Sequence, residues 1–257
     1  MKQRIQTAIL AIIVFLPFVL IGGKPFEIFV YILATIGLVE LMRMREIGKY
    51  SVPAVLAIAL LWLILGSIPI SWVTKSEVIM MFVLLLLSYT VLVKNKFTFD
   101  EAGFILLSTI YIGMGFFYLI ETRQDAGLVF LFYVLLVIWA TDTGAYFGGK
   151  AFGRRKLWPK ISPNKTIEGA AAGIILACVV AIIFYLIEPF SDSLMLVIGV
   201  TVLVSISGQI GDLVESALKR HYDVKDSGNI LPGHGGILDR LDSLLFVLPI
   251  LHFIHFI

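Results

Sequence analysis

The sequence predicts an all-α, polytopic membrane protein with about nine transmembrane helices. Hydrophobic residues make up 59% of its 257 residues and charged residues only 15%, whereas a soluble domain carries roughly 45–50% apolar and about 25% charged residues. Apolar runs of about 20 residues, the length that crosses a bilayer as a helix, recur from one end of the chain to the other. We therefore expect the chain to lie in a membrane.

The polar breaks between these runs predict the individual helices. We expect them at residues 4–22, 26–42, 52–71, 77–93, 102–120, 127–147, 167–187, 193–214 and 237–257. The first run follows Lys2 and Arg4, as the apolar part of a signal peptide would, but no convincing small-residue cleavage site follows it. We interpret it as a retained helix kinked or rearranged at Pro17, with a cleaved signal peptide as the alternative.

Positive charge predicts the orientation of these helices. If the predicted loops alternate across the membrane, 17 of the 20 Lys and Arg residues fall on one side, and cytoplasmic loops carry the excess of these residues. The N-terminus is therefore expected in the cytoplasm and the C-terminus outside, with long cytoplasmic loops at 148–166 and 215–236. We divide the chain into N-terminal membrane helices, 1–126, and a C-terminal region that carries the chemistry, 127–257.

Polar residues are sparse in the first half of the chain. Glu40 and the basic residues between Arg43 and Lys49 are interpreted as a helix end at the membrane interface that faces anionic lipid.

The second half has charged residues at predicted helix ends. Asp142 follows a strongly apolar run, and an acid within a membrane segment is a functional candidate by default, although a capping or ion-pair role is the alternative. Lys165 stands at the start of the seventh helix, where a cation and backbone amides could share a phosphate. Ser162 or Asn164 could cap this helix, with Glu168 completing the arrangement.

A second charged region follows the eighth helix. Asp212, Glu215 and Lys219 are spaced by three and four residues, so they share a face if the helix continues, and a Glu215–Lys219 ion pair is the alternative to a functional role. Further on, three glycines surround His234 and permit a tight turn whose amides approach an anion closely. Asp239 and Asp242 begin the last helix and, with Asp212, could hold a hard divalent cation.

Asp142, Asp212 and Asp239 are thus expected on one side of the membrane, beside two basic loops. Acids alone would indicate ion transport, whereas acids among lysines and arginines indicate a metal ion, Mg²⁺, that holds a polyphosphate. No Walker A sequence or dinucleotide fingerprint is present. A nucleotide must therefore be bound by another device, and we expect no nucleic acid partner.

The stretch SALKRHYDVKDSGNILPGHGGILDRLDS, residues 216–243, closely resembles the signature of the phosphatidate cytidylyltransferases, or CDP-diacylglycerol synthases. Residues 142–150 and 162–169 also resemble this family, so the resemblance covers roughly the C-terminal half. It implies a multi-pass enzyme of the bacterial-type inner membrane, in which CTP and phosphatidate, held among the surrounding phospholipid, give CDP-diacylglycerol and pyrophosphate. It also implies Mg²⁺ and a homodimer, and the predicted orientation places the active site on the cytoplasmic side.

The resemblance also implies roles for single residues. Asp212 and Asp239 would be metal ligands, joined by Asp142. Residues expected to act in catalysis are Lys219, Arg220, Lys225 and His234. Residues expected to bind the substrates are Asn164, Lys165, Ser216, Gly235, Gly236 and Arg240.

Two other functions stay open at this point. A CTP-dependent lipid kinase would accept the same nucleotide but transfer its γ-phosphate. An ion-coupled transporter also uses buried acids, although near the bilayer midplane and in related halves. A CDP-alcohol phosphotransferase is disfavoured, because that family has an Asp-Gly followed by Ala-Arg where this chain has Asp239, Arg240, Leu241 and Asp242 beside a His-Gly-Gly turn.

Overall fold

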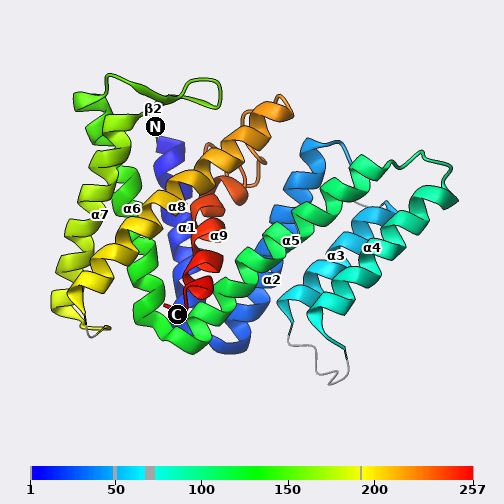
Figure 1. Cartoon of the computed structure of the whole chain (residues 1–257), viewed down its shortest axis with the longest axis horizontal. Helices are drawn as coiled ribbons and strands as arrows, with labels where there is room; N and C mark the ends of the chain where they lie inside the picture. The colour runs from blue at the N-terminus through cyan, green and yellow to red at the C-terminus, as the bar shows by residue number, and fades with distance from the viewer. Residues whose placement is uncertain (1, 49–50, 67–72, 192, 257) are drawn as a thin grey trace. The chain divides into compact units, whose positions relative to one another are not determined.

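The computed structural model describes residues 2–48, 51–66, 73–191 and 193–256, and in these ranges the protein is almost entirely helical (Figure 1). Its helices are α1 (Lys2–Ile21), α2 (Gly23–Met44), α3 (Val52–Leu65), α4 (Lys75–Leu92), α5 (Phe99–Glu121), the π-helical η1 (Thr122–Ala126), α6 (Gly127–Phe152), α7 (Ile167–Ile187), α8 (Leu194–His221) and α9 (Leu238–Phe253). One short antiparallel hairpin, β1 (Lys156–Trp158) with β2 (Ser162–Thr166), joins α6 to α7.

Five helical segments in the described ranges are long and apolar enough to cross a membrane. They are α2, α4, the continuous stretch Phe99–Phe152, α7 and α8, while Ile9–Ile21 and Val52–Leu65 are apolar but shorter. The chain is thus a helical protein with several candidate spans. The number nine for the spans, and their orientation, stay predictions.

The chain divides into two compact units. Unit 1 contains residues 1–120 and 226–238, and unit 2 contains residues 121–225 and 239–257. The predicted division at residue 126 stays a prediction.

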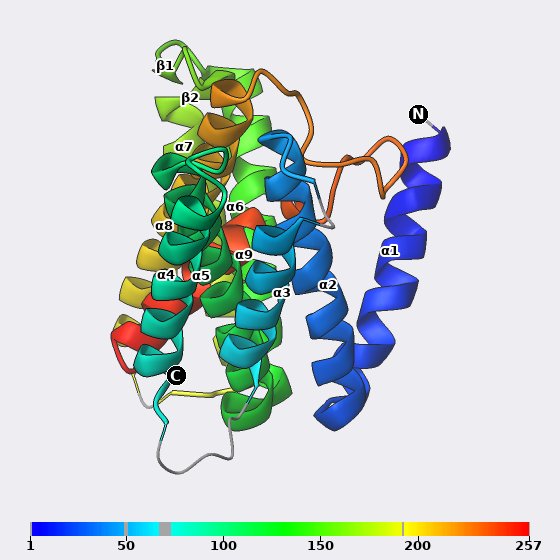
Figure 2. The ribbon, with the colours of Figure 1, turned by 90° about the vertical axis from the view of Figure 1, so that its right-hand side faces the viewer.

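In unit 1, helices α2 to α5 pack through large apolar side chains. Leu60 and Ile64 of α3 form a cluster with Val78 and Phe82 of α4. Gly113 brings α5 against this cluster, because a Cβ atom there would lie 3.0 Å from the Ile64 side chain. The segment 226–238 completes the unit and reaches α1 (Figure 2), where Thr7 Oγ1 donates a 2.8 Å hydrogen bond to the Pro232 carbonyl.

In unit 2, α6 and α7 pack closely because small residues face one another. A Cβ atom at Gly144 would lie 2.8 Å from the Ala172 carbonyl oxygen, and one at Gly173 would lie 2.7 Å from the Thr141 carbonyl oxygen. Small residues at four-residue spacing allow such close approach between helices in membranes. The Thr141 carbonyl, next to Asp142 in the chain, thus lies against Gly173, about two turns into α7.

Several predicted boundaries in unit 2 were wrong. The predicted loop 148–166 contains the last turn of α6 and the β1–β2 hairpin, and the loop predicted to begin at residue 215 begins only after His221, because α8 continues that far. Neither Ser162 nor Asn164 caps α7, since both belong to β2. Thr166 is the cap, and its Oγ1 accepts a 3.1 Å hydrogen bond from the Gly169 amide.

Other helices end differently from the prediction. The helix predicted at 52–71 ends at Leu65, and residues 67–72 lie outside the described ranges. The last helix is shorter than predicted, Leu238–Phe253 instead of 237–257. In α1 the helix continues through Pro17 to Ile21.

Candidate active site

Three aspartates from three helices of unit 2 lie close together. Asp142 of α6, Asp212 of α8 and Asp242 of α9 are near enough for each to feel the negative charge of another. The α8 and α9 backbones touch at this level, because a Cβ atom at Gly211 would lie 2.8 Å from the Asp242 carbonyl oxygen. Asp142 and Asp212, both predicted as metal ligands, are thus electrostatic neighbours, and Asp242 belongs to the same group.

Lys165 supplies a cation to this group. Its Nζ lies 2.5 Å from Asp212 Oδ2, and both side chains keep about a third of their surface exposed, 27% for Lys165 and 35% for Asp212. The other carboxylate oxygen of Asp212 accepts a 3.2 Å hydrogen bond from Ser216 Oγ, one turn further along α8. Lys165 and Ser216 thus contact different carboxylate oxygens of Asp212, and the Lys165–Asp212 pair is accessible to solvent.

Lys219 forms a second, more buried cluster. Its Nζ lies 2.5 Å from Asp239 Oδ1 and 2.9 Å from Glu215 Oε2, and the side chains are 12%, 5% and 5% exposed respectively. The intrahelical Glu215–Lys219 pair is thus present, and the same ammonium also links α8 to α9. Glu215 Oε1 is buried and has no hydrogen-bond partner within the described part of the chain.

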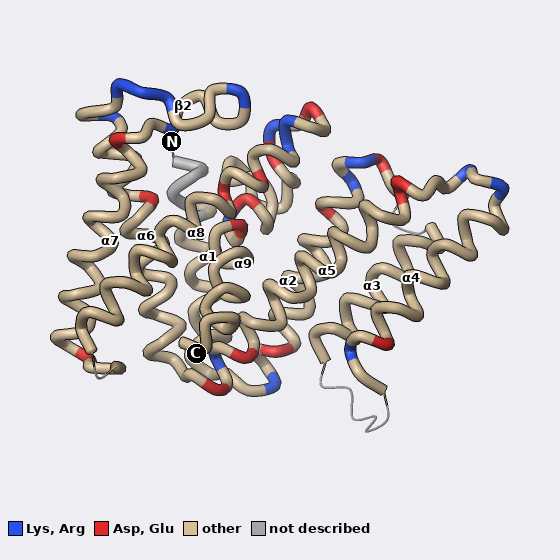
Figure 3. Tube along the Cα trace, in the orientation of Figure 1, with Lys and Arg blue, Asp and Glu red and all other residues tan. Residues whose placement is uncertain are grey.

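The remaining basic residues lie around these clusters. Arg220 Nε donates to the Ile161 carbonyl and its Nη1 to the Val224 carbonyl, both at 3.4 Å, so this arginine fastens the hairpin to the end of α8. Arg240 is exposed and close enough to interact electrostatically with Asp142. Lys225 and Asn164 are exposed. Figure 3 shows basic segments of the hairpin and of the end of α8 at one end of unit 2, with acidic positions below them in this view.

Hydrogen bonds from the two residues that precede the hairpin explain its position. Glu168, in the first turn of α7, accepts from the Arg154 amide at 3.0 Å and from the Arg155 amide at 3.1 Å. Because β2 leads directly into α7, these bonds also fix the strand that contains Lys165. Glu168 does not complete a capping box, as had been predicted, but anchors the incoming loop.

The carboxylates fit a hard divalent cation by their chemistry, since oxygen ligands are what Mg²⁺ prefers. Within the described ranges, however, no group of three or more His, Cys, Asp or Glu side chains is placed to hold a metal ion together. Asp239, one of the three predicted ligands, pairs with Lys219. Since Mg²⁺ is often bound by one or two carboxylates plus substrate phosphates, a smaller protein ligand set is sufficient.

The predicted glycine turn is present in unit 1. The Leu231 amide donates to the Gly235 carbonyl at 3.0 Å and the His234 amide to the Leu231 carbonyl at 2.8 Å. Gly233 and Gly235 have φ values of 75° and 84°, a region that glycine adopts without strain. The imidazole of His234 has its Nδ1 buried, with no hydrogen-bond partner among the residues that the structure describes.

The comparisons with known proteins identify the family. The model of the cytidylyltransferase family matches residues 2–257. The chain therefore belongs to the cytidylyltransferase family. Two similar relatives, both named phosphatidate cytidylyltransferase, are from Bacillus subtilis (strain 168), 55% identical over 99% of this chain and 97% of the relative, and from Staphylococcus haemolyticus (strain JCSC1435), 51% identical over 98% of each. The similarity thus extends over the N-terminal half, which matched this family only as apolar helices in the sequence analysis.

One buried residue of this cytidylyltransferase was misinterpreted from the sequence. Glu40 does not face lipid at the interface: its surface is 5% exposed, and it accepts hydrogen bonds from backbone amides at residues 237 and 238. A signal existed, because Glu40 is an acid within the apolar run of α2, and such acids are functional candidates by default.

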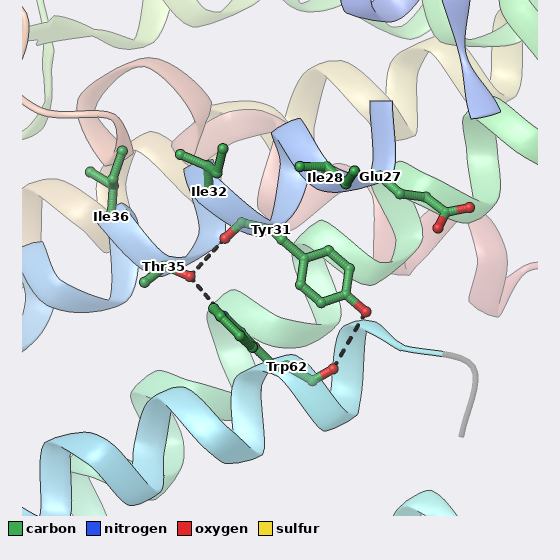
Figure 4. A pocket seen from close by; sticks show the side chains of 7 residues that line it. All are labelled: Glu27, Ile28, Tyr31, Ile32, Thr35, Ile36 and Trp62. Atoms are coloured by element: carbon green, nitrogen blue, oxygen red, sulfur yellow. Dashed lines mark hydrogen bonds between the residues drawn. The ribbon is translucent and has the colours of Figure 1, made fainter. Parts of the chain in front are cut away.

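A groove in unit 1 contains none of the predicted site residues. It has a volume of about 480 Å³ and is lined by α2 and α3 (Figure 4). Trp62 Nε1 donates to Thr35 Oγ1 at 3.0 Å on one wall. The residues predicted for the active site therefore do not line this groove.

Proposed function

We propose that this protein is a phosphatidate cytidylyltransferase. It transfers the cytidylyl group of CTP to phosphatidate, forming CDP-diacylglycerol and pyrophosphate in phospholipid synthesis. The similarity to phosphatidate cytidylyltransferases over nearly the whole chain carries this conclusion. The clusters of unit 2 are consistent with it, because they combine carboxylates with cations and the Lys165–Asp212 pair is partly exposed.

The reaction needs little acid–base chemistry from the protein. A phosphate oxygen of phosphatidate attacks the α-phosphorus of CTP, a new P–O bond forms, and the bond from the α-phosphorus to the bridging oxygen of pyrophosphate breaks. Because the attacking oxygen is already anionic near neutral pH, the site must mainly position two anions and stabilise the charge on the leaving pyrophosphate.

The basic side chains are suited to this task. Lys165 is partly exposed beside Asp212 and would bind the triphosphate, while Arg240 and Lys225 are exposed and able to turn toward phosphates. Lys219 is buried between two carboxylates and acts chiefly by holding Asp239. His234 would orient a phosphate or donate a proton, as the resemblance implies.

Mg²⁺ would be held by one or two of the predicted ligands Asp212, Asp239 and Asp142, together with substrate phosphates. When bound, it neutralises the triphosphate and polarises the α-phosphate for attack. Lys165 and Asp212 share a close contact in the protein alone, so the lysine is placed to move from the carboxylate to a phosphate as substrate and metal ion arrive.

The membrane arrangement is part of the same proposal. The charge distribution and the apolar runs of the sequence predict nine spans, a cytoplasmic N-terminus, an external C-terminus and an active site facing the cytoplasm of a bacterial inner membrane. This location would give CTP access from water and phosphatidate access from the bilayer. A homodimer without nucleic acid partners stays a prediction from the family resemblance.

The position of a radioactive label tests the proposed reaction. Purified protein in detergent with phosphatidate, Mg²⁺ and CTP labelled at the α-phosphate should produce labelled lipid, whereas γ-labelled CTP should give labelled pyrophosphate only. A lipid kinase would show the reverse pattern, with γ-label in the lipid. No label in lipid from either nucleotide would reject both transfer reactions and favour a transporter.

A further inference from the structure

Glu40 of α2 binds the backbone at the start of α9. Its carboxylate accepts a 2.9 Å hydrogen bond from the Ile237 amide and a 3.0 Å hydrogen bond from the Leu238 amide. The first amides of a helix lack intrahelical partners and carry partial positive charge. A buried carboxylate at this place therefore satisfies both amides and stabilises the helix end by its charge.

The loop between α8 and α9, residues 222–237, encloses this carboxylate. Ser227 Oγ donates a 3.2 Å hydrogen bond to Glu40 Oε2. A Cβ atom at Gly228 would lie 2.5 Å from Glu40 Oε1, and one at Gly236 would collide with Glu40 Oε1 and with Ser227 Oγ. Neither glycine has a positive φ, so glycine is required at both positions for space.

The residues that follow this contact belong to the charged clusters. Asp239 is next to Leu238 in the chain, and Asp242 lies one turn later on α9. A shift of the helix start by one residue would rotate the face that these carboxylates occupy by about 100°. The hydrogen bonds from the Ile237 and Leu238 amides to Glu40 therefore determine the direction in which α9 presents Asp239 and Asp242.

We propose that Glu40 is a positioning residue for nucleotidyl transfer, which fixes the start of α9 and thereby places Asp239 and Asp242. This inference rests on the proposed function. It also gives Gly236 a different role from the predicted one: its lack of a side chain makes room for the Glu40 carboxylate, and the anion that the neighbouring amides bind is intramolecular.

Glu40→Gln is the most direct variant. Glutamine keeps the size and one acceptor oxygen, but its amide nitrogen cannot accept a hydrogen bond from Ile237 or Leu238, and the charge is lost. Glu27→Gln is the matched control, because Glu27 lies on the same helix and pairs with the exposed Lys24 at 2.6 Å. Amide hydrogen exchange of the peptides that cover 226–243 would be measured alongside kcat and KM for CTP.

We expect Glu40→Gln to speed amide exchange in 226–243 and to lower kcat at least about tenfold, the effect of losing one charge-assisted hydrogen bond. The Mg²⁺ concentration for half-maximal activity should rise, and Glu27→Gln should resemble the wild-type protein. Unchanged exchange and kcat in a folded Glu40→Gln protein would overturn the proposal. If this variant does not fold, Ser227→Ala should change amide exchange and kcat in the same direction by a smaller amount. A Ser227→Ala protein whose exchange and kcat equal those of the wild type would also reject the proposal.

A double-mutant cycle separates the two roles of Gly236. If Gly236 makes room for Glu40, the single variant Gly236→Ala should lower kcat. In a Glu40→Ala background, where the carboxylate is absent, the same substitution should lower kcat little further. A full additive loss with raised KM for CTP would show instead that Gly236 contacts substrate, and the packing role would be wrong. An inactive wild-type protein would reject the proposed function, whereas the exchange measurement tests the role of Glu40 independently of activity.

Discussion

Lys219→Met should destabilise the protein strongly. The Lys219 side chain is 12% exposed, and its ammonium lies 2.5 Å from Asp239 and 2.9 Å from Glu215, whose side chains are each 5% exposed. Methionine keeps a similar length but leaves two buried carboxylates facing each other without a cation. Removing one partner of a buried ion pair costs about 3–5 kcal/mol, and a protein of this size loses about 2–4 °C of midpoint temperature per kcal/mol. We therefore expect the midpoint of thermal unfolding in detergent to fall by roughly 6–20 °C.

Fluorescence-detected thermal unfolding measures this fall, with Lys96→Met as control because Lys96 is exposed. In an Asp239→Asn background Lys219→Met should lower the unfolding midpoint less, since one of the two buried carboxylates is already replaced by a neutral amide. A midpoint within about 2 °C of the Lys96→Met control would refute the reasoning, because it would mean that the ammonium contributes no more than a surface charge.

Three further predictions concern the surroundings of the site. Lys165→Met should raise KM for CTP about tenfold or more yet change stability by less than about 1 kcal/mol, because its pair with Asp212 is part-exposed; an unchanged KM in steady-state kinetics would exclude a role in triphosphate binding. Gly144→Ala should destabilise by about 1–3 kcal/mol, because its Cβ would meet the Ala172 carbonyl oxygen at 2.8 Å, and a wild-type unfolding midpoint would contradict this tight packing. Thr166→Ala should cost about 1 kcal/mol through the lost α7 cap, and Thr166→Ser should restore the midpoint; equal midpoints for both variants would argue against a capping role.

The helices could be predicted from the sequence because lipid forces backbone groups to pair within a segment, so each long apolar run becomes a helix. Helix ends were harder to predict. The polar residues after Val214 were interpreted as a loop, yet α8 continues to His221, stabilised by the Glu215–Lys219 pair. Hydropathy shows where an apolar run ends. A helix can continue beyond that point outside the membrane, as α8 does.

The site residues were found in part, and the limits have physical causes. Charge and spacing predicted that acids and lysines gather, but they do not determine which lysine meets which carboxylate, so the pairing of Lys219 with Asp239 came only from the structure. Glu40 was missed because its partners, the amides of residues 237 and 238, are separated from it by 197 and 198 positions in the chain. The β1–β2 hairpin was missed because its short polar strands are fastened through Glu168, outside the hairpin.

Transfer of the α-phosphate label from CTP to phosphatidate by purified wild-type, Asp212→Asn and Asp239→Asn proteins tests the central claim most directly. Each asparagine variant must first show a thermal unfolding transition, so that loss of activity is not loss of fold. We predict that lipid labelling requires Mg²⁺, disappears on chelation, and falls at least about a hundredfold in both variants, as when a charge-stabilising group in an active site is removed. Undiminished labelling in both folded variants, or labelling that persists without divalent metal, would contradict a metal ion bound by Asp212 of α8 and Asp239 of α9.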